Sequence, residues 1–285
     1  MEEGTIRLEQ EIQQIADMLL LHGTLTECPG LIHGKMGIAV FFFHYYQYTG
    51  NELFEDYAFD LIGEIKNQIH ANTPADYENG IAGIGTGIGY LMCNKFLNVA
   101  GNVFDDFDSR MYRAVMYDPW KDFSLFDGLC GLGRYWASRL RQQSTLEAAR
   151  KCLNYIVEKI EDKLSEIDFD DQAEVYCFLL DLQLISGFES CMKLLEKCWI
   201  TWGLQSMDVL RCFPRLGDSG VGNIVRKYQC GRYFNDELHV DIERIPVLDM
   251  GKAPVSTGFL NGYAGDGMLR LTVLNQMDIS WMNLL

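Results

Sequence analysis

The chain has 285 residues, of which 48% are hydrophobic, and its formal net charge at pH 7 is -16. This acidic balance excludes nucleic acid as an expected partner, because a protein that binds phosphate backbones needs a basic surface to displace their counterions. Acidic residues at positions 2 and 3, and the lack of any run of about 18 apolar residues, predict a cytoplasmic protein with no secretion signal and no membrane span.

The first elements along the chain are a glycine-rich turn and an apolar helix. Gly34 begins a Gly-x-x-Gly-x-small pattern, and residues 36–48 are apolar nearly all round, as expected for a helix that is packed on every side. Residues 54–69 have an apolar stripe at helical spacing with charged residues opposite, and residues 145–164 repeat that arrangement. These two segments are predicted to be outer, half-solvated helices.

The glycine pattern recurs five times. Its copies begin at Gly34, Gly80, Gly128, Gly217 and Gly262, which lie 46, 48, 89 and 45 residues apart. The long interval predicts a degenerate copy near residue 172, where residues 171–175 open another apolar run. A period of this length fits two helices and their connections. We therefore predict an all-α fold, an α/α toroid of about six helical hairpins in one domain spanning residues 1–285.

The glycines have a predicted mechanical role at the start of each inner helix. A residue without a side chain permits positive φ and a close approach of neighbouring backbone. Five spaced copies favour this interpretation over glycines that merely connect helices.

With their continuations, these turns resemble the lanthionine synthetase C-like (LanC-like) family. The resemblance rests on Gly37-Ile38-Ala39, on Gly220-Val221-Gly222-Asn223 and on the stretch from Gly258 to Gly265, and it extends from about Leu31 to Leu274. It implies a toroid of seven hairpins. It also implies cyclases that hold zinc at the mouth of the ring, where the metal activates a peptide cysteine to attack a dehydrated Ser or Thr. This chain is one hairpin short.

The zinc ligands that the resemblance implies are absent. The family places a Cys in a Cys-x-Gly-Asp-x-Gly turn and a Cys-His pair before the glycine of the next turn. Here Arg215 stands at the first position, and Leu260-Asn261 precede Gly262, unless that turn is the family's final one. Zinc needs Cys, His or carboxylate ligands. We therefore expect no metal and no other cofactor.

Polar residues precede most of the glycine turns and are the candidate site. If the turns line one rim, the residues before each first glycine form a ring of His33, Asn79, Asp127, Asp171, Leu216 and Asn261. We expect catalytic roles for His33, Asp127 and Asp218, since imidazole and carboxylate groups transfer protons. We expect Asn79, Asp171, Arg215 and Asn261 to bind ligand. The plainer interpretation is that Asn79, Asp127 and Asn261 cap their helices.

Two further residues could contribute at the rim. Arg215 and Asp218 lie in one turn and could pair in the space that zinc fills in the cyclases, where Arg215 could dock a peptide carboxylate. Cys130 lies inside the third turn, where a helix N-terminus can lower the pKa of a thiol, although packing is the more common role.

Two classes of function remain open. The first is a zinc-free LanC-like protein that binds a peptide substrate, or assists a partner maturation enzyme, in modified-peptide biosynthesis. The second is a glycan-active enzyme on a six-hairpin toroid, with Asp127, Asp171 and Asp218 as its acid and base candidates. Trp120, Tyr117 and Trp136 cluster around the third turn and could stack on sugars, or they could pack in the core.

Overall fold

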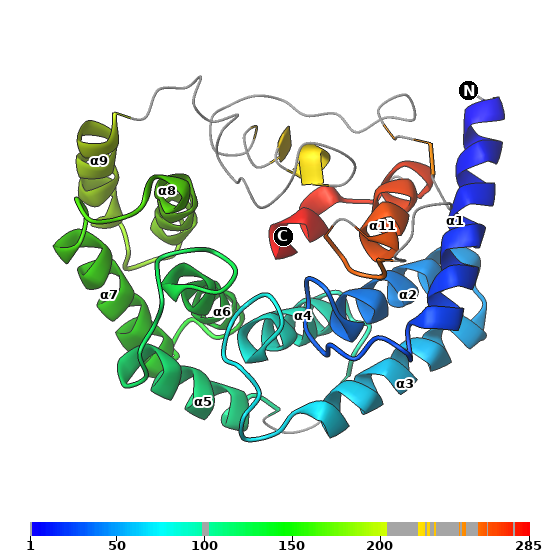
Figure 1. Cartoon of the computed structure of the whole chain (residues 1–285), viewed down its shortest axis with the longest axis horizontal. Coiled ribbons are helices and arrows are strands. Elements are labelled where there is room, and N and C mark those ends of the chain that lie inside the picture. Colours follow the sequence, from blue (N-terminus) through cyan, green and yellow to red (C-terminus); the bar gives the residue numbers. More distant parts are fainter. Residues whose placement is uncertain are drawn as a thin grey trace. The chain divides into compact units, whose positions relative to one another are not determined.

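The structure is a computed structural model, and it describes residues 2–98, 103–203, 222–225, 227–228, 231, 245, 247–248, 256–260, 262–275 and 277–285. Over these ranges the chain forms helices and no strand, which confirms the all-α prediction (Figure 1). The chain divides into two compact units. The first comprises Met1–Asn72, Leu216–Arg232 and Asp236–Leu285, and the second comprises Thr73–Arg215 and Tyr233–Asn235.

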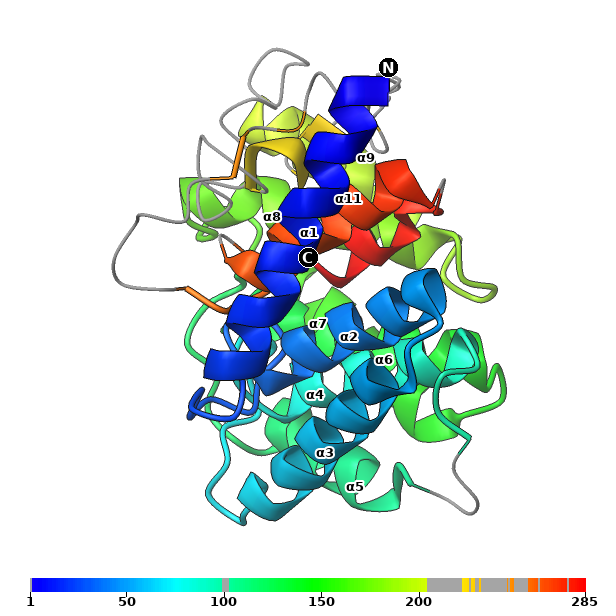
Figure 2. The same ribbon diagram turned by 90° about the vertical axis from the view of Figure 1, so that its right-hand side faces the viewer.

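The first unit brings the two ends of the chain together. It contains α1 (Glu2–His22), α2 (Lys35–Thr49), α3 (Glu52–Gln68), α11 (Tyr263–Leu274) and the 3-10 helix η4 (Ile279–Leu284). Helix α11 packs against both α1 and α2, and α1 lies beside it in both views (Figures 1 and 2). The guanidinium of Arg270 joins α11 to α1 by a 2.9 Å contact with Glu11, and both side chains are buried.

The first unit also confirms the predicted contrast between two kinds of helix. Eleven consecutive residues of α2, from Lys35 to Tyr45, are buried, as predicted for a helix packed on every side. Helix α3 packs along α2 and buries only one stripe, which consists of Phe54, Ala58, Leu61 and Ile65. That stripe is the one predicted from helical spacing.

The second unit repeats this contrast. It contains α4 (Ile81–Cys93), α5 (Asp105–Met116), α6 (Leu129–Gln142), α7 (Glu147–Asp162), α8 (Phe169–Gln183) and α9 (Cys191–Trp202). Helix α6 packs against α4, α7 and α8, while α7 buries only the stripe of Ala149, Cys152, Leu153, Ile156 and Ile160. Helix α8 begins three residues before the position near 172 that was predicted for the degenerate copy, and its N-cap is Asp168 instead of a glycine.

Four of the five glycine turns lie in the described residues, and they share one geometry. Gly34, Gly80, Gly128 and Gly262 are the N-caps of α2, α4, α6 and α11. After each glycine, the next backbone N–H donates a 2.9 Å hydrogen bond to the carbonyl seven residues earlier. The pairs are Lys35 with Cys28, Ile81 with Pro74, Leu129 with Asp122, and Tyr263 with Ser256. The fifth turn, at Gly217, lies outside the described residues.

The structure corrects the reason for these glycines. Their φ values run from -104° to -142°, so the prediction of positive φ is wrong. The prediction of close backbone approach is confirmed. A Cβ at Gly80 would lie 2.2 Å from the carbonyl oxygen of Pro74, and one at Gly34 would lie 2.4 Å from that of Cys28. The loop that precedes each helix folds back over the glycine and leaves no room for a side chain.

Candidate functional site

The folded-back loops determine which side chains face outward. Three residues before the glycine, each loop buries an apolar side chain, namely Leu31, Tyr77, Leu125 or Phe259. The residue directly before the glycine is exposed at His33 and half-buried at Asn79 and Asp127. The polar residues before the glycines of these three turns therefore lie at the surface of their own units, and the predicted ring that they would form stays a prediction.

The N-cap residues of α4 and α6 are the glycines Gly80 and Gly128. Asn79 and Asp127 therefore stand one residue before the N-cap position that the capping interpretation gave them. The backbone N–H of Asn79 donates to a carboxylate oxygen of Asp76 at 2.7 Å.

The third turn gathers carboxylates around one buried hydroxyl. The Oγ of Ser124 lies 2.6 Å from Oδ1 of Asp122 and 2.7 Å from Oδ1 of Asp127, and Ser124 is fully buried. A serine has one hydroxyl proton, so the two carboxylates compete for it. The ammonium of Lys121 lies 2.8 Å from Oδ2 of Asp127 and 3.7 Å from Oδ2 of Asp122, and its side chain is mostly exposed.

The second turn adds acidic charge to the same unit. The pKa of Asp76 is raised from its ordinary value, first by burial and then by the nearby charges of Glu78 and Asp127, although the hydrogen bond from the Asn79 backbone opposes the shift. Asp76 and Asp127 therefore interact electrostatically across two turns. Burial and like charges thus both disfavour the ionised form of the Asp76 carboxyl group.

Asp171 lies in the second unit with these groups, but its carboxylate is buried. One oxygen accepts the backbone N–H of Phe123 at 3.2 Å. Glu174, one helical turn further along α8, is 1% exposed and accepts the backbone N–H of Leu125 at 2.6 Å. Sequence reasoning missed Glu174. Glu174 stands two residues after the degenerate glycine position. At the same position the other described copies have an uncharged residue, namely Met36, Ala82, Cys130 or Ala264, so the charge of Glu174 was the available signal.

Cys130 is a packing residue. Its thiol is fully buried, and its pKa is raised well above the ordinary value by that burial and by the negative charges of Glu174, Asp171 and Asp122. The hypothesis that the helix N-terminus lowers this pKa is therefore wrong, because desolvation and neighbouring carboxylates outweigh the helix dipole.

His33 belongs to the first unit, on the turn that meets the last repeat. The backbone N–H groups of Phe259 and Leu260 donate to the carbonyl of Ile32 at 2.7 and 3.2 Å. The hydroxyls of Thr26 and Thr257 lie 2.9 Å apart beside them. Lys35 directly follows the glycine of this turn. Its side chain is buried, and its ammonium lies 2.5 Å from a carboxylate oxygen of Glu64.

Several predicted positions lie outside the described residues, namely Arg215, Leu216, Asp218 and Asn261. The predicted pairing of Arg215 with Asp218 is therefore not tested. Leu260 is described, and it is an apolar, buried residue at one of the positions where the resemblance would imply a zinc ligand. In the described part of the chain, no three His, Cys, Asp or Glu side chains are arranged to hold a metal ion. An apolar side chain cannot bind zinc, so Leu260 does not fit that role.

The aromatic cluster near the third turn divides into core and surface. Trp136 is fully buried, which confirms the packing interpretation for that residue. Tyr117 is 74% exposed, and Trp120 is partly exposed and packs on Phe123 with ring centroids 5.1 Å apart.

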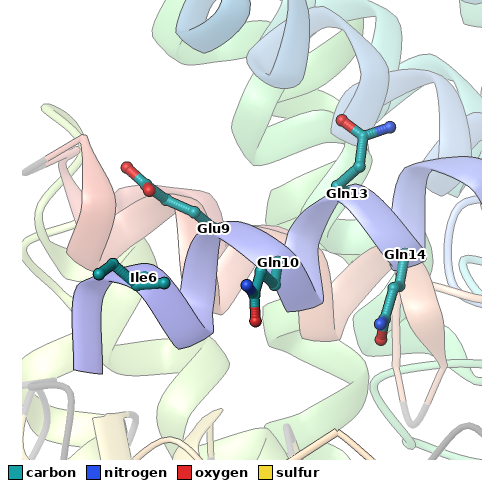
Figure 3. A pocket seen from close by; sticks show the side chains of 5 residues that line it. All are labelled: Ile6, Glu9, Gln10, Gln13 and Gln14. Atoms are coloured by element: carbon teal, nitrogen blue, oxygen red, sulfur yellow. The ribbon is translucent and has the colours of Figure 1, made fainter. Parts of the chain in front are cut away.

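A surface hollow of about 500 Å³ lies on α1 and involves none of the predicted site residues. Figure 3 shows its five lining side chains, Ile6, Glu9, Gln10, Gln13 and Gln14, along successive turns of that helix. Four of the five are polar, and the hollow is wide open to solvent.

Comparison with known protein families finds no family model that matches the sequence, and no curated protein matches it either. Within the described ranges, no helix is both long enough and apolar enough to cross a membrane.

Proposed function

We propose that the chain is a LanC-like α/α toroid that binds a peptide over its glycine turns and acts as a zinc-free accessory protein in peptide modification. One observation carries the proposal. The glycine turn recurs four times with the same 2.9 Å backbone hydrogen bond, and three of its copies present a polar residue at the surface directly before the glycine. A rigid, repeated scaffold with variable polar residues is suited to binding an extended ligand along its turns.

The bonds between neighbouring turns support the toroid. In the second unit, the N–H groups of Tyr77 and Glu78 donate to the carbonyl of Phe126 at 2.8 and 3.0 Å. In the first unit, Phe259 and Leu260 donate to Ile32 at the same positions of their turns. The second pair joins the last repeat to the first, which is the connection that a closed ring of repeats requires.

The charges around the third turn favour a peptide that carries Lys or Arg side chains. Asp122, Asp127 and Asp76 belong to one unit. The exposed ammonium of Lys121 forms ion pairs with the carboxylates of Asp122 and Asp127. A basic side chain of the ligand can take the place of Lys121 with little loss, because exposed ion pairs are weak and exchange readily.

The test is a binding measurement with three fluorescent peptides of equal length, one rich in Lys, one neutral and one rich in Glu. We expect the Lys-rich peptide to bind most tightly and Asp127→Asn to weaken its affinity about tenfold, a typical loss for one charged contact. Asp56→Asn is the matched control, because it removes the same charge from an exposed position on α3. Equal affinity for all three peptides, or equal losses in both variants, would contradict the proposal.

The second candidate is the glycan-active enzyme, and the raised pKa of Asp76 favours it. Glycoside hydrolysis uses two carboxyl groups whose surroundings push their pKa values apart, and burial raises the pKa of Asp76. Of the three carboxylates expected from the sequence, Asp127 stays a candidate, and Asp76 takes the place of Asp171, which is buried against the Phe123 backbone. Release of reducing sugar from a panel of α- and β-linked oligosaccharides, abolished by Asp76→Asn, would support this candidate over peptide binding.

A further inference from the structure

Two described pairs of neighbouring turns are joined in one way. The donors are the N–H groups three and two residues before the glycine, and the acceptor is the carbonyl two residues before the glycine of the next turn. Tyr77 donates to Phe126 at 2.8 Å in the second unit, and Phe259 donates to Ile32 at 2.7 Å in the first. The third turn has the equivalent donor at Leu125, but the repeat that follows it has no glycine turn.

We propose that Glu174 and Asp171 replace the missing turn of the fourth repeat and are positioning residues for the third. Leu125 lies three residues before Gly128, as Tyr77 lies before Gly80, and its N–H donates to the carboxylate of Glu174 at 2.6 Å. Asp171 receives the N–H of Phe123 in the same loop at 3.2 Å. Two carboxylate side chains of α8 thus accept hydrogen bonds from the loop of the third turn, in place of the backbone carbonyl that a following glycine turn would supply.

This replacement fixes the loop that carries the candidate site. The loop from Lys121 to Asp127 holds Asp122, Ser124 and Asp127, and the two α8 carboxylates accept from the residues on either side of Ser124. Both carboxylates are buried, so their bonds to backbone N–H groups are shielded from competing water. Loss of the Glu174 carboxylate leaves the Leu125 N–H buried without its acceptor and frees the loop to move.

The experiment measures amide hydrogen exchange of residues 121–127, resolved to single amides, in the unmodified chain and in four variants. We expect Glu174→Ala to accelerate exchange at Leu125 about tenfold or more, because it removes a charge-assisted hydrogen bond. Glu174→Gln keeps an oxygen acceptor and should restore most of the protection. Asp171→Ala removes the acceptor of the Phe123 N–H and should accelerate exchange at Phe123. Glu158→Ala, an exposed change on α7, is the control and should leave the loop unchanged.

The consequence for binding rests on the proposed function and is measured separately. With the Lys-rich peptide, Glu174→Ala should lower affinity about as much as Asp127→Asn does, and Glu174→Gln should recover it. Unchanged exchange at Leu125 in Glu174→Ala would overturn the inference even if the peptide binds. Should Glu174→Ala fail to fold, unchanged exchange at Phe123 in Asp171→Ala would overturn it. Absence of peptide binding to the unmodified chain would overturn only the proposed function.

Discussion

The glycine turn makes the sharpest prediction about stability, and Gly80→Ala tests it. A Cβ at Gly80 would lie 2.2 Å from the carbonyl oxygen and 2.7 Å from the carbonyl carbon of Pro74, so backbone has to move by about an ångström. The φ of -112° suits alanine, so conformational strain is not the cause. Overpacking costs about 1–3 kcal/mol, and weakening the hydrogen bond from Ile81 to Pro74 adds about 1 kcal/mol. We expect a total loss of about 2–4 kcal/mol.

Gly63→Ala is the matched control. Gly63 lies on the exposed face of α3, and a Cβ there meets nothing within 4 Å. Alanine in a helix is more favourable than glycine by about 0.5–1 kcal/mol, so this variant should be more stable. Thermal unfolding followed by circular dichroism should show Gly80→Ala melting on the order of 10 °C lower and Gly63→Ala slightly higher. Equal melting temperatures for the two variants would refute the close-packing account of the turn.

Three further predictions concern titratable groups. Burial lowers the pKa of His44 to about 4, so the unfolded chain binds a proton below pH 6.5 that the folded chain does not. Stability should therefore fall by about 2 kcal/mol between pH 7 and pH 5, and His44→Leu should remove that part of the slope in urea titrations. The raised pKa of Asp76 has the opposite effect on the pH dependence of stability, because the folded chain keeps a proton that the unfolded chain releases as pH rises. Asp76→Asn should therefore stabilise the fold at pH 7 and have less effect at pH 3; equal effects at both pH values would contradict this. Iodoacetamide should modify the exposed Cys93 long before Cys130 in the folded protein, as mass spectrometry of the labelled peptides would show.

Local sequence patterns predicted many features of the fold. The stripes of α3 and α7 follow from helical spacing alone, and the all-round apolar character of residues 36–48 indicated the burial of α2. The repeat period placed the start of α8 to within three residues without a glycine there. The stripes depend on residues within a turn or two of one another and the period on counting along the chain, so a single sequence reveals both.

The contacts within the site depend on residues far apart in the chain, and they were harder to predict. Asp171 was expected to bind ligand, but it accepts a bond from Phe123, 48 residues earlier. Glu174 escaped notice because periodicity does not indicate which backbone N–H a buried carboxylate will meet. The hypothesis of a lowered pKa at Cys130 fails because the thiol is buried and carboxylates from other segments surround it, while the packing alternative holds. Of the two reasons expected for the glycines, positive φ is wrong and close backbone approach is confirmed, because the backbone of the loop before each glycine leaves no room for a Cβ.

The most direct test of peptide binding at the turns is a hydrogen-exchange map of the unmodified chain with and without saturating Lys-rich peptide. The account predicts slower exchange in the loops at residues 74–80 and 122–128, which precede α4 and α6, with no change over α3 and α7. Protection confined to α3 or α7, or no protection anywhere in the chain at saturation, would contradict it.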